Sequence, residues 1–75
     1  MDREIVERHL AATEKHIVEG RKHMERQRQI IARNILEGAD QVHAKELLTA
    51  MEQSQVLHEQ YSDWLRQQLG LPPVR

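Results

Sequence analysis

Five histidines give this chain its most distinctive chemistry, and three of them recur at a fixed interval. His9, His16 and His23 lie seven residues apart, and the other two are His43 and His58. Imidazole nitrogens are common ligands of transition metals, and imidazole titrates near neutral pH, so metal binding and pH sensing both have to be considered. Residues seven apart on a helix are separated by about 10.5 Å along its axis, so the three regularly spaced imidazoles cannot share one ion.

One set of candidate metal ligands is compatible with this distance. Glu19 and His23 are four residues apart and therefore lie on the same face of a helix. His58, or the same pair from a second copy of the chain, could complete the set. The sequence lacks the paired Glu-x-x-His motifs of di-iron bundles, so we interpret the histidines as residues that flank a helical core, without a metal or cofactor. Metal binding and pH sensing stay open as alternatives.

The sequence contains no motif that indicates catalysis. It has no cysteine, no glycine-rich phosphate loop and no serine at a sharp turn. Its carboxylates are dispersed along the chain, and we interpret them as partners of neighbouring basic residues on solvated helix faces. We therefore expect a protein that is not an enzyme and has no catalytic residues.

Basic side chains are concentrated in one segment, which consists of Arg21, Lys22, Arg26, Arg28 and Arg33. With Glu25 counted against these five, residues 21–33 have a net charge of +4, whereas residues 40–69 have −3. In a dimer, two basic segments could form a binding surface for RNA or another anion. We favour the simpler interpretation that the basic segment faces the acidic helix of its own or a partner chain. The whole chain has a net charge of −1, so general attraction to nucleic acid or membranes is not indicated.

Two long helices are expected to position these residues. Leu10, Ile17, Met24 and Ile31 recur every seven residues, a spacing typical of a helix packed along a narrow seam. The chain has no Phe, and aromatic residues make up only 3% of it, which suits thin helical contacts better than a globular core. The sequence therefore predicts an all-α protein.

Capping signals predict the boundaries of one helical-hairpin domain that covers residues 1–75. Asp2 is a suitable N-cap, Gly38 suits the left-handed position after a helix, and Gly70 followed by two prolines suits a helix end. The predicted elements are a helix over about 2–37, a turn at 38–39, a second helix over about 40–69 and a frayed tail over 70–75. A turn this short implies that the two helices are antiparallel.

The heptad pattern also predicts which residues meet. The seam of the second helix is predicted to contain Ala44, Leu47, Met51, Ser54, His58, Tyr61, Leu65 and Gln68. The residues with the strongest claim to the core or interface are Leu10, Ile17, Gly20, Met24, Ile31, Leu47, Met51, His58, Tyr61 and Leu65. A turn near residue 39 sets Gly20 opposite His58 and His16 opposite Tyr61. We expect Gly20 to provide space for a facing side chain, because glycine inside a helix costs about 1 kcal/mol relative to alanine.

The size of the chain predicts self-association. A domain of 75 residues without cysteine has a small core and no disulfide to support it. The seam of the second helix is widened by further apolar residues, so one side can contact the first helix and the other a second hairpin. These residues are Leu48, Ala50, Leu57, Trp64 and Leu69. We expect a homodimer that forms a four-helix bundle or antiparallel coiled coil, with a further protein partner left open. The sequence begins without the apolar run of a signal peptide, which predicts a cytoplasmic protein with no membrane partner.

Several short segments resemble those of a known group of proteins. The segments are His16-Ile17-Val18-Glu19-Gly20, His23 and Gln27 in the first helix, and Glu46-Leu47-Leu48 and Gln55-Val56-Leu57-His58 in the second. They resemble short helical-hairpin proteins of bacteria related to rhizobia, which have no assigned function. The resemblance implies a bacterial cytoplasmic protein and brings no catalytic residues with it.

Overall fold

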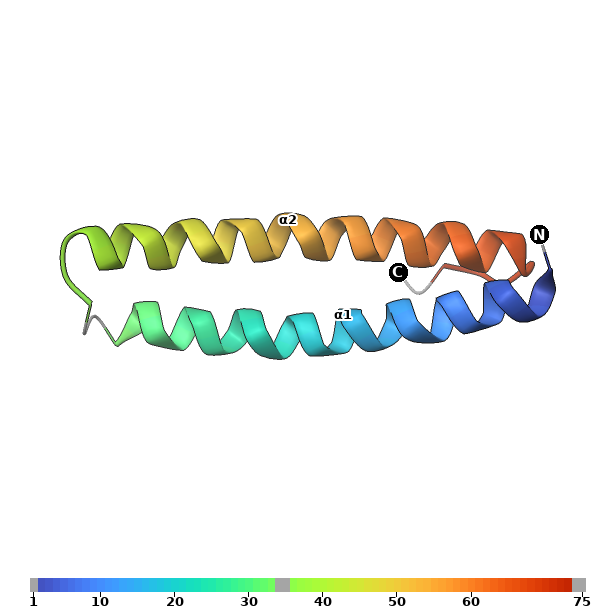
Figure 1. Ribbon diagram of the computed structural model, residues 1–75, viewed down its shortest axis with the longest axis horizontal. Helices are drawn as coiled ribbons and strands as arrows, with labels where there is room; N and C mark the ends of the chain where they lie inside the picture. Colours follow the sequence, from blue (N-terminus) through green and yellow to red (C-terminus); the bar gives the residue numbers. More distant parts are fainter. Residues whose placement is uncertain (1, 34–35, 74–75) are drawn as a thin grey trace.

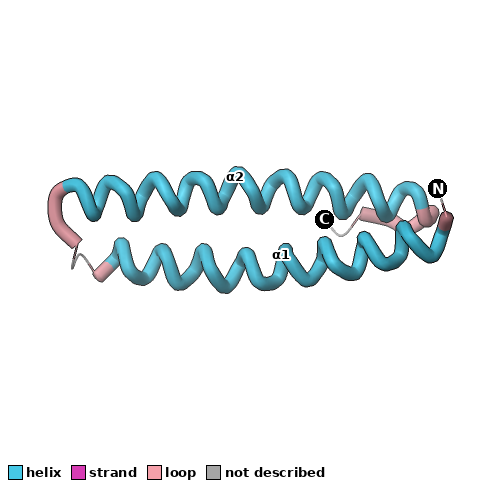
Figure 2. Tube along the Cα trace, viewed as in Figure 1, coloured by secondary structure: helices cyan, strands magenta, loops and turns pink. Residues whose placement is uncertain are grey.

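The structure is a helical hairpin. It is a computed structural model that describes residues 2–33 and 36–73. Helices α1 (Arg3–Ala32) and α2 (Ala39–Gln68) lie side by side and antiparallel (Figure 1). Within the described residues, loops occur only in the connection and at the two ends of the chain (Figure 2). The predicted all-α hairpin is confirmed, and neither described helix combines the length and apolar character that crossing a bilayer requires.

Both predicted caps at the open end of the hairpin are confirmed. The Asp2 carboxylate accepts a hydrogen bond of 3.2 Å from the backbone N–H of Glu4. At the end of α2, Gly70 has a φ of +72°, and the backbone N–H of Leu71 donates to the carbonyl of Arg66 at 2.8 Å. A second bond, from the N–H of Gly70 to the carbonyl of Gln67, completes a Schellman motif.

The connection between the helices is longer than predicted. Helix α1 ends at Ala32, five residues before the predicted end at residue 37, whereas α2 begins at Ala39, one residue before its predicted start. Gly38 has the expected positive φ, +57°, but it is the N-cap of α2 rather than the residue that ends α1. A longer α1 would extend beyond the first turn of α2 and would have no partner to pack against, so its helix propensity is not enough to continue it.

The predicted row of α1 packs against α2. Its buried residues are Val6, Leu10, Thr13, Ile17 and Met24, and Ile31 is half-buried further along the same row. At the open end of the hairpin, Val6 and Leu10 form an apolar cluster with Leu65 and Leu69 of α2. The heptad prediction for α1 is therefore confirmed.

On α2, half of the predicted seam is wrong. The residues that face α1, here called the inner row, are Ala44, Leu48, Met51, Gln55, His58, Ser62, Leu65 and Leu69. Every second member was predicted, but Leu47, Ser54, Tyr61 and Gln68 are exposed.

Polar side chains explain why the inner row was missed. Gln55 is buried because its Nε2 donates a hydrogen bond of 2.9 Å to the backbone carbonyl of Ile17 on α1. Ser62 is buried because it is small enough for a close helix contact. The predicted seam had Ser54 and Tyr61 at the places that Gln55 and Ser62 occupy in the structure.

The pairing of residues across the hairpin also differs from the prediction. His16 stacks on His58, with ring centroids 5.7 Å apart, and Gly20 lies against the side chain of Gln55. The predicted pairs Gly20 with His58 and His16 with Tyr61 are therefore wrong. Each of these α1 residues meets a residue three positions earlier on α2 than predicted, because α1 ends five residues before its predicted end.

Gly20 is expected to be coupled energetically to Gln55. A Cβ at Gly20 would meet the side-chain amide of Gln55 and displace it from its bond to Ile17. Alanine in a helix is favoured over glycine by about 1 kcal/mol, so Gly20→Ala should stabilise the Gln55→Ala protein by about that amount. In the wild-type protein this gain should be lost, and Gly20→Leu should be destabilising. Urea unfolding of the double-mutant cycle tests this, and equal effects of Gly20→Ala in both backgrounds would contradict it.

Candidate interaction surface

Helix α2 carries a second apolar row beside the one that packs on α1. This outer row has the same alternating steps of four and three as the inner row, and its members are His43, Leu47, Ala50, Ser54, Leu57, Tyr61, Trp64 and Gln68. Its large apolar members are exposed: Leu57 is 64% accessible, Leu47 49%, Trp64 44% and Tyr61 41%. The outer row has the spacing of a helix-packing seam, but in the part of the chain that the structure describes no helix packs along it.

Three histidines of α1 lie along the same side of the hairpin. The hydroxyl of Tyr61 is 3.2 Å from Nδ1 of His9, a hydrogen-bond distance. His16 stacks on His58, and His23 lines a groove together with His16, His58 and Ser54. We call the surface formed by His9, His16, Glu19, His23, His58 and the outer row the histidine face.

Charge distinguishes the histidine face from the rest of the hairpin. Among the described residues that form it, Glu19 is the one side chain with a full charge at neutral pH. Its other polar groups are imidazole, hydroxyl and amide groups. Low charge together with Tyr and Trp is characteristic of the buried centre of protein interfaces.

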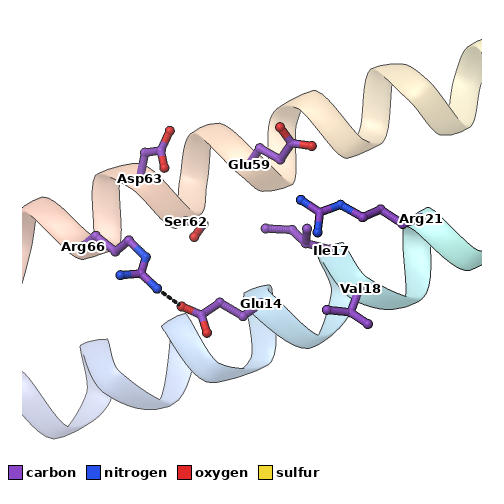
Figure 3. A pocket seen from close by; sticks show the side chains of 8 residues that line it. All are labelled: Glu14, Ile17, Val18, Arg21, Glu59, Ser62, Asp63 and Arg66. Atoms are coloured by element: carbon purple, nitrogen blue, oxygen red, sulfur yellow. Dashed lines mark hydrogen bonds and ion pairs between the residues drawn. The ribbon is translucent and has the colours of Figure 1, made fainter. Parts of the chain in front are cut away.

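The opposite side of the hairpin is rich in ions. We call it the ion-pair face, and Figure 3 shows its central groove, lined by Glu14, Ile17, Val18, Arg21, Glu59, Ser62, Asp63 and Arg66. Arg66 on α2 donates to Oε1 of Glu14 on α1 at 2.7 Å, and Arg21 extends toward α2 on the side of Glu59 (Figure 3). Arg66 and Glu14 are already paired, and burying further charged side chains is costly, so covering this face is unfavourable.

The basic segment of the sequence is divided between two surfaces. Arg28 lies 3.9 Å from carboxylate oxygens of both Glu25 and Glu52, and Arg21 lines the ion-pair groove. These two residues agree with the interpretation that the segment faces acidic side chains of α2. The remaining members, Lys22, Arg26 and Arg33, are exposed and make no ion pair within the described residues.

The candidate metal ligands share a groove but do not form a site within one chain. Glu19, His23 and His58 line the groove with His16, and its volume is about 310 Å³. Within the described residues, no group of three or more His, Cys, Asp or Glu side chains could hold a metal ion. The pair in ring contact, His16 and His58, was missed because the predicted register set His16 opposite Tyr61.

Comparisons of the chain with known protein families, with curated protein sequences and with solved structures found no match.

The ion pair between Arg66 and Glu14 is expected to stabilise the hairpin more than a pair at its surface. Arg66 is only 21% exposed and Glu14 43%, and Nε of Arg66 is buried without a hydrogen-bond partner among the described residues. We expect Glu14→Gln to lower the free energy of unfolding by about 1 kcal/mol, since it removes the charge opposite a mostly buried guanidinium.

The matched control for Glu14→Gln is Glu7→Gln, which breaks the pair of Glu7 with Arg3 at the surface of the same helix. These two side chains are 53% and 68% exposed. The expected loss is about 0.3 kcal/mol or less, because solvent screens such pairs. Urea unfolding of both variants provides the comparison, and a larger loss for Glu7→Gln would contradict the assignment.

Proposed function

We propose that this chain is a small non-enzymatic interaction protein that works as a homodimer, in which two copies bury their histidine faces against each other. The observation that supports this proposal is the exposed outer row of α2, with Leu57 64% and Trp64 44% accessible. Four helices would then form an antiparallel bundle or coiled coil. A bacterial and cytoplasmic setting, as the sequence resemblance implies, is part of the same proposal.

The dimensions of the hairpin suit such an interface. Its extents of 50 and 19 Å give the broad face an area of about 950 Å². Stable protein interfaces bury about 800 Å² on each partner, so the face is large enough for a specific dimer. The outer row supplies Leu47, Leu57, Tyr61 and Trp64 to its centre, and aromatic anchors of this kind dominate the energies of many interfaces.

The difference between the two faces supports the choice of the histidine face. Covering the ion-pair face would bury Glu14, Arg21, Glu59, Asp63 and Arg66, and buried charges cost several kcal/mol each unless fully paired. Covering the histidine face buries one full charge per copy, on Glu19. The remaining histidines can be buried as neutral imidazoles that donate and accept hydrogen bonds.

The proposal is tested by a pair of substitutions at neighbouring positions. Leu57 lies in the outer row, whereas Val56 is 51% exposed on another side of α2. In an antiparallel dimer Leu57→Glu sets two buried carboxylates near each other, so we expect it to raise the dimer dissociation constant at least 100-fold. The matched variant Val56→Glu should leave that constant within a factor of about three.

Sedimentation equilibrium of the two variants and the wild-type protein measures these constants. Circular dichroism serves as the control for helix content. A monomeric wild-type protein, or equal weakening by both variants, would contradict the proposal.

A second candidate function is the binding of RNA through the exposed basic residues of α1. The observation that favours it is the absence of ion pairs at Lys22, Arg26 and Arg33 within the described residues, which leaves three cations directed to solvent. Binding of this kind would be dominated by phosphate contacts and would weaken steeply with salt.

Fluorescence anisotropy with a labelled RNA hairpin tests this second candidate. If the chain binds RNA, its affinity should fall at least tenfold between 50 and 200 mM salt. The triple variant Lys22→Ala, Arg26→Ala, Arg33→Ala should lose at least another tenfold, while Lys45→Ala on α2 should change little. Absence of binding at low salt would exclude the candidate.

A further inference from the structure

The contact between His16 and His58 joins the two helices on the histidine face. Their ring centroids are 5.7 Å apart and the rings are inclined by 26°. Both side chains line the groove that also contains Glu19 and His23. Gly20 lies in the wall of the same groove and adds no side chain to it. Two imidazoles are thus held next to each other beside open space on a surface that we propose is covered by a second copy.

The separation of the two rings suits ligands of one metal ion. A zinc–nitrogen bond is about 2.1 Å long, and the centre of an imidazole ring lies about 1.2 Å beyond the nitrogen, so each ring centre is about 3.3 Å from the ion. Two such rings at the tetrahedral angle have centres about 5.4 Å apart. The observed 5.7 Å between His16 and His58 is within a small side-chain adjustment of this value.

The position of the pair along the hairpin determines what a second copy adds. The bounds of the helices give a midpoint between residues 17 and 18 for α1 and between residues 53 and 54 for α2. His16 and His58 therefore lie within about one and a quarter turns of the middle of their helices. Both lie on the side of the open end, so a two-fold axis that crosses the hairpin about 4.5 Å from its midpoint, level with the pair, sets the pair against its own copy. The two histidine pairs would then face each other.

We propose that one divalent transition-metal ion of the zinc class binds between two copies of the chain, held by His16 and His58 of each copy. This inference rests on the proposed homodimer. A single chain supplies two imidazoles, whereas a tetrahedral site needs four ligands, so the second copy completes the site. Nitrogen ligands favour zinc, copper, nickel or cobalt and disfavour magnesium and calcium, which prefer oxygen.

Charge at the proposed site is balanced by Glu19. Four neutral imidazoles leave the two positive charges of the ion uncompensated in an interface with few other charges. Glu19 lines the same groove, three residues after His16, and the two copies supply one carboxylate each. Carboxylates near metal-bound histidines also accept the N–H of the second ring nitrogen and orient the ring. His23 lies in the same groove but is not needed as a ligand.

Zinc binding to metal-free, untagged protein tests the inference. Native mass spectrometry should show one zinc ion per dimer, and titration calorimetry should give a stoichiometry of one ion per two chains. His16→Ala and His58→Ala should each lower the zinc affinity at least 100-fold. Val56→Ala is the control, because Val56 is 51% exposed on another side of α2 from the histidine face, and it should retain wild-type affinity.

The oligomeric state of the metal-free protein separates this inference from the proposed function. A dimer that binds no zinc, or that binds it with undiminished affinity after His16→Ala and His58→Ala, overturns the metal site and leaves the homodimer standing. One zinc ion per monomer also overturns it. A protein that stays monomeric with and without zinc overturns both proposals.

Discussion

A pair of helices packed side by side can bury only one strip of each, and this limit determines the rest of the structure. The inner row of α2 and the matching row of α1 form the buried contact between the two helices. Any other apolar residue then stays at the surface, as the outer row of α2 does. No third layer within the described residues covers it. A second hairpin is the simplest cover, because it presents the same geometry and adds two more helices to the core.

Polar residues between the helices determine the register in which α1 packs against α2. Gln55 bonds to the carbonyl of Ile17, and Gln27 donates in the same way to the carbonyl of Ala44 at 2.9 Å. Each amide crosses from one helix to the backbone of the other, so a rotation or shift of either helix would leave it buried without a partner. Gly20 leaves room for one of these amides. The register is therefore set by a few directional bonds inside an otherwise apolar contact.

The sequence was sufficient to predict the hairpin, both helix ends at the open side and the inner face of α1. These features follow from local signals such as Asp2, the Gly70 stop and a heptad of apolar residues. The positions of Gln55 and Ser62 in the inner row of α2 and the contact of His16 with His58 were not predicted. Two neighbouring rows of α2 both have helix-packing spacing, and only tertiary contacts of Gln55 and Ser62 decide between them. The end of α1 also depends on tertiary packing, since its last predicted turns have no helix to contact.

The two broad faces of the hairpin differ in the chemical groups that they present to solvent. The ion-pair face has charges that interact across the helices, as Glu14 and Arg66 do, and such a surface is stable in water. The histidine face combines exposed aromatic and aliphatic side chains with imidazoles that can be buried neutral or can bind a metal ion. Assembly and metal binding would then depend on the same surface, which joins the two proposals to one interface.

Disulfide cross-linking of single-cysteine variants tests most directly whether a second copy covers the histidine face. The chain has no cysteine, so each introduced thiol is unique. Leu57 lies in the outer row close to the level of the proposed two-fold axis, and Val56 lies on another side of that helix. The account predicts that Leu57→Cys forms a covalent dimer rapidly under mild oxidation, whereas Val56→Cys stays reduced. Equal rates for the two variants, or faster cross-linking through Val56→Cys, would contradict it.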